Sequence, residues 1–185
     1  MKNRKSGDAG MKYDQAQVRI HEAYTVAIRD LGVHGEGIGS VDGFTVFVHG
    51  ALPGETVTAE ITLLKKSYAV GKLLSIEQES PFRTVPECSV YEHCGGCQLS
   101  HLTYEGQLDM KYRRVKDVIE RIAGESGDLV KPVLPAAHPF AYRNKMAVPA
   151  GLVKGKAALG CYRQGSHDII PVSSCAIQKD GTCGR

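Results

Sequence analysis

The stretch GIGSVDGFTVFV, residues 37–48, carries the clearest signal of how the first part of this chain folds. It contains two short runs of alternating apolar residues on either side of the pair Asp42-Gly43. An Asp-Gly pair between two such runs is a strong signal for a two-residue β-hairpin turn, because both turn positions need a positive φ angle. We therefore predict strands over residues 37–41 and 44–48, joined by a tight turn.

The segments on both sides of this hairpin also alternate, and each predicts a further strand. Upstream, Tyr24, Val26 and Ile28 share one face of a first strand. Downstream, residues 56–64 alternate in the same way, and residues 68–76 give another strand after a basic turn. Five strands in about 60 residues are typical of a closed or nearly closed barrel of the OB type.

Three closely spaced glycines precede the hairpin. Gly35, Gly37 and Gly39 superficially resemble a dinucleotide-binding loop, but such a loop opens a helix, and no helical pattern follows here. We expect these glycines to serve a curved strand or a bulge instead.

The chain beyond the barrel predicts a mixed region of helix and strand. From Thr103 to Ala123 apolar residues recur at close to helical spacing, which predicts one amphipathic helix of about five turns that ends at Gly124. Glycine-rich turns then separate three further predicted strands, over residues 144–150, 157–162 and 168–171.

These patterns divide the chain into three regions. Residues 1–17 are polar and rich in lysine, and they predict a flexible basic tail. Residues 18–79 form the predicted barrel, and residues 80–185 form the second domain. The expected fold class is mainly β with an α+β part: an N-terminal OB-like five-stranded barrel, followed by an α+β domain that carries a cysteine loop.

Composition excludes some classes of protein without selecting one. Apolar residues make up 42% of the chain, yet no apolar run approaches the roughly 20 residues that a membrane span needs. Residues 1–17 hold no apolar segment that could act as a signal peptide, so a cytoplasmic location without membrane contact is expected. Lysine and arginine exceed aspartate and glutamate by 23 to 20, an excess that permits nucleic-acid binding without demanding it.

Six cysteines without a secretory signal favour reduced thiols or metal ligands over disulfides. Cys88, Cys94 and Cys97 lie close together, and Gly95 and Gly96 are expected to adopt the positive φ angles that aim successive sulfurs at a common centre. Three soft ligands and one remote ligand suit zinc or an iron–sulfur cluster; spacing alone leaves both open, beside uncoordinated thiols. The candidates for the fourth ligand are Cys161, Cys175, Cys183 and His93.

Two groups of basic and aromatic residues could contact RNA, since cations pair with phosphates and rings stack on bases. The first group surrounds one predicted hairpin of the barrel and comprises Lys65, Lys66, Tyr68 and Lys72. The second group lies in the α+β domain and comprises Tyr142, Arg143, Asn144, Lys145 and Arg163. Each group has a competing interpretation. The first could be a solvated hairpin, and the second could be half-exposed strand residues that pack on one another.

The barrel, the cysteine loop and the second basic group occur in the same order in a known family. The sequence resembles the bacterial RNA (uracil-C5)-methyltransferases, particularly the 23S ribosomal RNA enzymes of Gram-positive bacteria. The most recognisable part of that family's TRAM domain, an OB-like RNA-binding barrel, is matched by residues 30–57, DLGVHGEGIGSVDGFTVFVHGALPGETV. The cluster loop is matched by residues 87–111, ECSVYEHCGGCQLSHLTYEGQLDMK, and the central domain by YRNKMAVP (142–149) and YRQGSHDIIPVSSCAIQ (162–178).

This resemblance implies a [4Fe-4S] cluster rather than zinc. In the family the fourth ligand is a cysteine within the stretch that residues 162–178 match, which leaves Cys161 and Cys183 as bystanders. The implied partner is RNA, with 23S ribosomal RNA as the expected target, and the chain is expected to be a monomer. The implied cluster ligands are Cys88, Cys94, Cys97 and Cys175.

Members of the family continue into a domain that binds S-adenosylmethionine and supplies a nucleophilic cysteine and a glutamate base. No Gly-rich βα turn for that cofactor occurs in this sequence, nor does a Ser-His-Asp, HExxH or P-loop signature. We therefore expect a truncated central domain, no catalytic domain and no activity of this chain alone, with S-adenosylmethionine bound only by the full-length enzyme.

Two other hypotheses compete with this one. The first is a self-standing TRAM-type RNA-binding module with a Cys-ligated metal or iron–sulfur site and no catalytic activity. The second is a TRAM-containing radical methylthiotransferase, which is disfavoured because that family carries TRAM at its C-terminus and uses a Cys-x3-Cys-x2-Cys cluster.

Overall fold

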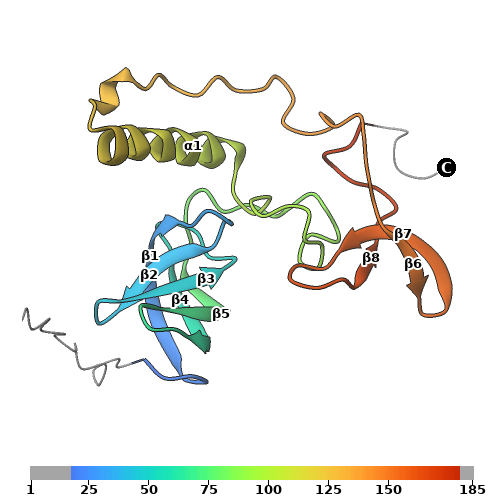
Figure 1. Ribbon diagram of the computed structural model, residues 1–185, viewed down its shortest axis with the longest axis horizontal. Helices are drawn as coiled ribbons and strands as arrows, with labels where there is room; N and C mark the ends of the chain where they lie inside the picture. The colour runs from blue at the N-terminus through green and yellow to red at the C-terminus, as the bar shows by residue number, and fades with distance from the viewer. Residues whose placement is uncertain (1–17, 180–185) are drawn as a thin grey trace, which may run out of the picture. The chain divides into compact units, whose positions relative to one another are not determined.

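The computed structural model describes residues 18–179 (Figure 1). These residues divide into two units. The first unit ends at Ser80 and the second begins at Pro81. The predicted tail over residues 1–17 and Cys183 lie outside the described residues. Within residues 18–179, no helix is long and apolar enough to cross a membrane.

The first unit is a closed β-barrel, as the sequence predicts. Its strand order is β1-β2-β3-β5-β4, in which β3 and β5 run parallel and all other neighbours run antiparallel. The fifth strand continues to Gln78, slightly beyond its predicted end. The bounds are β1 (Ala23–Leu31), β2 (Gly37–Val41), β3 (Phe44–His49), β4 (Thr56–Leu64) and β5 (Tyr68–Gln78).

The hairpin between β2 and β3 confirms the turn prediction. Asp42 and Gly43 have φ angles of 47° and 83°, which is the left-handed pair that a two-residue hairpin turn requires. Alternate side chains of the strands then meet inside the barrel, so that one face of each strand builds the core. The fully buried apolar residues of this core are Val18, Val26, Ile28, Val46, Val48, Ala51, Val57, Ala59, Ile61 and Ala69.

Two of the three closely spaced glycines belong to the barrel wall, whereas Gly35 lies in the turn before β2 with a φ angle of 84°. Gly37 and Gly39 lie in β2, and the register of the neighbouring strand β1 shifts between Ile28 and Asp30, which marks a bulge opposite them. The expectation of a curved, bulged strand is therefore confirmed. A Cβ atom at Gly39 would overlap the Val26 side chain and lie 2.6 Å from the Ala27 carbonyl oxygen.

Replacing Gly39 with alanine should lower the free energy of unfolding of the barrel by about 1–3 kcal/mol, since the added methyl group forces the packed strands apart. Urea unfolding followed by hydrogen exchange of the barrel amides measures this loss. Thr25→Ala, at an exposed position of β1, is the control and should change stability little. Equal stabilities of the two variants would contradict the close approach of β1 and β2.

The second unit contains one helix and a small antiparallel sheet. Its elements are α1 (Tyr104–Val118), a π-helical turn (Ile119–Ala123), a 3-10 turn (Gly127–Leu129), and the sheet β6-β7-β8 formed by β6 (Ala150–Val153), β7 (Lys156–Tyr162) and β8 (Ile169–Pro171). The predicted helix is confirmed at both ends, because the Thr103 hydroxyl accepts the Gly106 N–H and Gly124 adopts φ 72°.

The apolar stripe of this helix is not buried within the second unit. Val115, Val118 and Ile122 are 50%, 46% and 79% exposed, and the single buried residue of α1 is Gly106. The spacing therefore predicts the helix correctly, whereas the burial that normally accompanies such spacing is not found among the described residues.

The predicted strand over residues 144–150 is wrong. The segment is irregular up to Pro149, and the strand β6 begins at Ala150. Lys154 and Gly155 have positive φ angles of 51° and 77°, which form a tight turn, and the strands of this hairpin pair on either side of it. Pro149 lacks the N–H that a strand ladder needs, so the strand does not extend back through it.

Candidate functional site

The cysteine loop is folded by its own backbone hydrogen bonds. The Tyr91 N–H donates to the Cys88 carbonyl at 3.1 Å, and the Cys94 N–H donates to the Val90 carbonyl at 2.8 Å. The Gly96 N–H then points at the Cys94 Sγ atom, 3.4 Å away. These turns bring Cys88 back toward the later cysteines of the same loop.

The glycines of this loop act differently from the prediction. Gly95 and Gly96 are not among the glycines with positive φ angles within the described residues, so that part of the expectation is wrong. Gly95 is instead required by close approach, because an added Cβ would lie 3.0 Å from the Tyr162 carbonyl and 3.1 Å from the Gln164 backbone. The Gly95 N–H donates to that same Tyr162 carbonyl at 2.8 Å and ties the loop to the end of β7.

A second set of hydrogen bonds holds the later cysteine segment in place. The Ala141 N–H donates to the Ala176 carbonyl and the Arg143 N–H to the Ile177 carbonyl, each at 2.9 Å. The Lys179 N–H closes the pair by donating to the Arg143 carbonyl at 2.7 Å. The segment that precedes β6 therefore runs beside the segment that follows Cys175.

Five cysteines from these segments line one cavity of about 100 Å³. They include every cysteine that the sequence singles out within the described residues, whereas His93 is exposed and does not line the cavity. In residues 18–179 no three Cys, His, Asp or Glu side chains converge closely enough to hold a single metal ion. The thiols thus surround a space rather than meet at one point; they are Cys88, Cys94, Cys97, Cys161 and Cys175.

Burial and mutual repulsion shift the pKa values of two of these thiols. Burial raises the pKa of Cys97, while a hydrogen bond with Ser100 opposes that shift. Burial, followed by the neighbouring Cys94, raises the pKa of Cys161 to about 11. Bound metal cations relieve this kind of repulsion, because a coordinating thiol is deprotonated by the ion's own charge.

A buried amide also faces this cavity. Gln178 lines it and is 5% exposed, and its Oε1 atom has no hydrogen-bond partner within residues 18–179. The unpartnered atom is an acceptor, so it can receive a hydrogen bond from a donor group that enters the cavity. Sequence reasoning missed Gln178, which gives no signal in the sequence beyond its place three residues after Cys175.

The first predicted RNA-binding group lies on the β4–β5 hairpin. The Lys65 N–H donates to the Tyr68 carbonyl at 2.8 Å, and Tyr68 and Lys72 lie on the outer face of β5. Phe47 of β3 meets the Tyr68 ring edge to face, with ring centres 5.4 Å apart. Sequence reasoning missed Phe47, although its position between buried Val46 and Val48 already places it on the outer face.

The second predicted RNA-binding group is divided by the structure. Tyr142, Arg143, Asn144 and Lys145 are consecutive and exposed, and the Arg143 guanidinium lies 6.0 Å from the centre of the Tyr142 ring. Arg163 belongs to a different segment, the turn after β7, where its side chain pairs with Asp168 at 3.8 Å.

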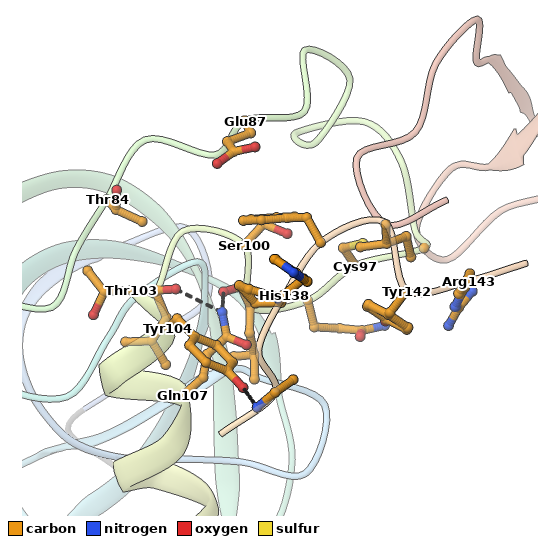
Figure 2. Close-up of a pocket in the computed structure, with 18 of the residues that line it drawn as sticks. Thr84, Glu87, Cys97, Ser100, Thr103, Tyr104, Gln107, His138, Tyr142 and Arg143 are labelled. Carbon is orange, nitrogen blue, oxygen red and sulfur yellow. Dashed lines mark hydrogen bonds between the residues drawn. The ribbon is translucent and has the colours of Figure 1, made fainter. Parts of the chain in front are cut away.

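A larger cavity of about 650 Å³ adjoins the cysteine loop within the second unit (Figure 2). It is lined by the start of α1, by the loop that contains Cys97, and by residues 138–140, 142 and 143. Sequence reasoning missed this cavity, because its walls come from segments that are far apart in the chain.

Comparison with known proteins places the barrel in a defined family. Residues 17–74 match the model of the TRAM domain. The described barrel strands of the first unit fall almost entirely within this range.

Curated relatives of this chain are RNA methyltransferases. A protein from Bacillus cereus described as an uncharacterized RNA methyltransferase is 47% identical over 163 residues, which cover 88% of this chain and 35% of the relative. A protein of the same description from Clostridium tetani is 44% identical over 163 residues, again 88% of this chain and 35% of the relative. The chain thus spans about a third of the length of the curated relatives it matches.

One solved structure shares the fold of most of the chain. It is the crystal structure of Pyrococcus abyssi tRNA (uracil-54, C5)-methyltransferase in complex with S-adenosyl-L-homocysteine. The TM-score is 0.58 at 24% identity, and the match covers 85% of this chain and 33% of that one. Residues 17–74 are therefore a TRAM domain, in a chain that is related over most of its length to RNA methyltransferases.

Proposed function

We propose that this chain is the RNA-binding and iron–sulfur part of an S-adenosylmethionine-dependent methyltransferase that acts on C5 of uracil in 23S ribosomal RNA. The observation that carries the proposal is the meeting of the four family-type cysteines around one cavity, in a chain whose relatives are RNA methyltransferases. Methyl transfer itself belongs to the longer protein, in which S-adenosylmethionine supplies the methyl group.

The barrel supports the RNA-binding part of this proposal. Its outer face carries the Phe47–Tyr68 pair beside exposed Lys72, and the exposed Lys65 lies on the adjoining turn. Rings that stack on bases, with cations that track phosphates, are the usual combination for binding single-stranded RNA. In the second unit, the exposed run from Tyr142 to Lys145 offers the same chemistry.

The thiol cavity supports a [4Fe-4S] cluster. Each iron of such a cluster takes one cysteine thiolate, so the ligands have to surround a space rather than converge on one ion. The donor set fits this requirement, because the four cysteines line one cavity without converging on a single point. The proposed ligands are Cys88, Cys94, Cys97 and Cys175.

Such a cluster would act on the protein as a cross-link. It would join the loop that contains Cys94 to the segment at Cys175, which the backbone already holds beside Arg143. Cluster binding would thereby fix the exposed RNA-binding run next to the cysteine loop, since a metal site that is absent in the unfolded state adds its binding energy to folding.

RNA binding by the full chain should weaken steeply with salt. Anisotropy titrations of a labelled single-stranded 23S ribosomal RNA segment at several salt concentrations give the slope of log affinity against log salt. Each phosphate that the protein neutralises on a single strand adds about −0.7 to this slope. The double variant Lys65→Glu, Lys66→Glu should therefore bind all tested RNA sequences less tightly and with a shallower slope.

The matched control is the double variant Lys154→Glu, Lys156→Glu, which reverses two exposed charges at the β6–β7 turn. It should keep most of the affinity and the slope of the natural chain. Binding that does not respond to salt, or an equal loss of affinity in the two double variants, would contradict the proposed electrostatic surface of the barrel.

A further inference from the structure

The 650 Å³ cavity of the second unit adjoins the space that the proposed cluster would fill, and the two share Cys97 and Arg143 in their walls. Its volume lies within the roughly 300–1,000 Å³ that is usual for small-molecule sites. We propose that this cavity holds one unpaired nucleotide of a bound RNA strand, an inference that rests on RNA binding as the function of the chain.

Exposed rings at the cavity favour a nucleobase as the occupant. Tyr142 and Phe140 both line it and are 60% and 38% exposed, so each presents part of its ring to an incoming group. An exposed aromatic ring is free to stack on a base. Such stacking tolerates any base sequence, because every base has a flat face.

The charges of the cavity favour a phosphate beside that base. Lys111 and Arg143 line it, against the single carboxylate of Glu87. The Arg143 guanidinium lies over the Tyr142 ring, 6.0 Å from its centre, so a cation and an aromatic ring stand together at this cavity. Arginine beside an aromatic ring is a recurrent arrangement for splayed single-stranded RNA.

The remaining polar groups can read the edge of a base. Gln98, Ser100 and Thr84 line the cavity and supply one amide and two hydroxyl groups. An amide and a hydroxyl both donate and accept hydrogen bonds, which is what the Watson–Crick edge of an unpaired base needs.

The walls of the cavity are held in place before any ligand binds. The Ala136 N–H donates to the Tyr104 hydroxyl at 2.7 Å, which joins the start of α1 to the segment that leads to Tyr142 (Figure 2). The Gln107 amide donates to the carbonyls of Leu99 and Leu102 at 3.2 and 2.9 Å, which ties α1 to the cysteine loop. A preformed cavity binds its ligand without the cost of ordering its walls.

Tyr142 and Lys111 variants of the full chain test this inference. The probe is a short single-stranded RNA with 2-aminopurine at one internal position, whose fluorescence falls when the base stacks on a ring. Tyr142→Ala should weaken RNA binding roughly 5- to 100-fold and abolish the fluorescence change, as expected for the loss of one base–aromatic stack. Tyr142→Phe should preserve both the affinity and the fluorescence change, and Lys111→Ala should weaken binding without abolishing the change.

The matched controls lie on the same unit but do not line the cavity. Tyr162→Ala removes an exposed tyrosine of β7, and Lys131→Ala removes an exposed lysine. Both should bind the probe like the natural chain. If the natural chain binds RNA and Tyr142→Ala binds it equally well with an unchanged fluorescence signal, the nucleotide site is wrong while RNA binding stands.

Two other results separate the remaining explanations. If the natural chain binds no RNA at any salt concentration, RNA binding itself is wrong, and the nucleotide site is lost with it. If free uridine monophosphate binds as tightly as the oligonucleotide and depends equally on Tyr142, the cavity serves a free nucleotide, and its assignment to an RNA strand is overturned.

Discussion

Replacing Cys175 with serine should abolish most of the visible absorbance of protein that has been reconstituted anaerobically with iron and sulfide. The reason is that a serine hydroxyl is a poor ligand for iron, and the proposed cluster has four thiolate ligands from two distant segments. Single serine variants at Cys88, Cys94 and Cys97 should have the same effect. Iron and sulfide analysis of each purified variant gives the occupancy directly.

Cys161→Ser is the matched control, because Cys161 lines the same cavity and is not a proposed ligand. It should retain the cluster. Loss of the cluster in Cys161→Ser, with retention in Cys175→Ser, would show that β7 and not the later segment supplies the fourth ligand. Stoichiometric zinc without iron in anaerobically purified protein would overturn the cluster altogether.

Replacing Glu55 with alanine should destabilise the barrel by about 2–5 kcal/mol, since it leaves two buried N–H groups without this acceptor. Glu55 is 1% exposed, and its carboxylate accepts the Leu52 N–H at 2.8 Å and the Ser80 N–H at 3.3 Å. These hydrogen bonds join the turn before β4 to the residues that follow β5, so one side chain links two parts of the barrel.

Urea unfolding of the full chain, followed by hydrogen exchange of the barrel amides, measures this loss separately from events in the second unit. Glu79→Ala is the control, because Glu79 is exposed and lies one residue before Ser80. It should change the stability by less than about 0.5 kcal/mol, as is usual for surface substitutions. Equal unfolding midpoints for the two variants would show that the buried carboxylate adds nothing to the barrel.

Much of the barrel could be predicted from the sequence because its signals are local. The Asp42-Gly43 turn fixes one hairpin, and the alternation of apolar residues fixes which face of each strand is buried. The two ends of the helix could also be predicted from the sequence. Thr103 and Gly124 are residue types that favour the first and last positions of a helix because of their own local conformation.

The candidate sites were accessible only in part. The cysteine spacing drew attention to Cys88, Cys94 and Cys97, and the family resemblance added Cys175, which lines the same cavity. Gln178 could not be found in this way, because a glutamine acquires a role only through the groups that fold around it.

Local sequence signals were sufficient for the β2–β3 hairpin and the caps of α1, whose hydrogen bonds close within a few residues. Alternation of apolar residues also marked the barrel strands, whereas the β1–β4 and β3–β5 pairings that close the barrel join distant residues. The pairing of residues 141–143 with residues 176–179 became visible only in the folded chain. The same holds for the five thiols around one cavity and for the larger cavity beside them. These features rest on contacts between distant segments, and the loop-closure cost and packing of such contacts leave no trace in local spacing.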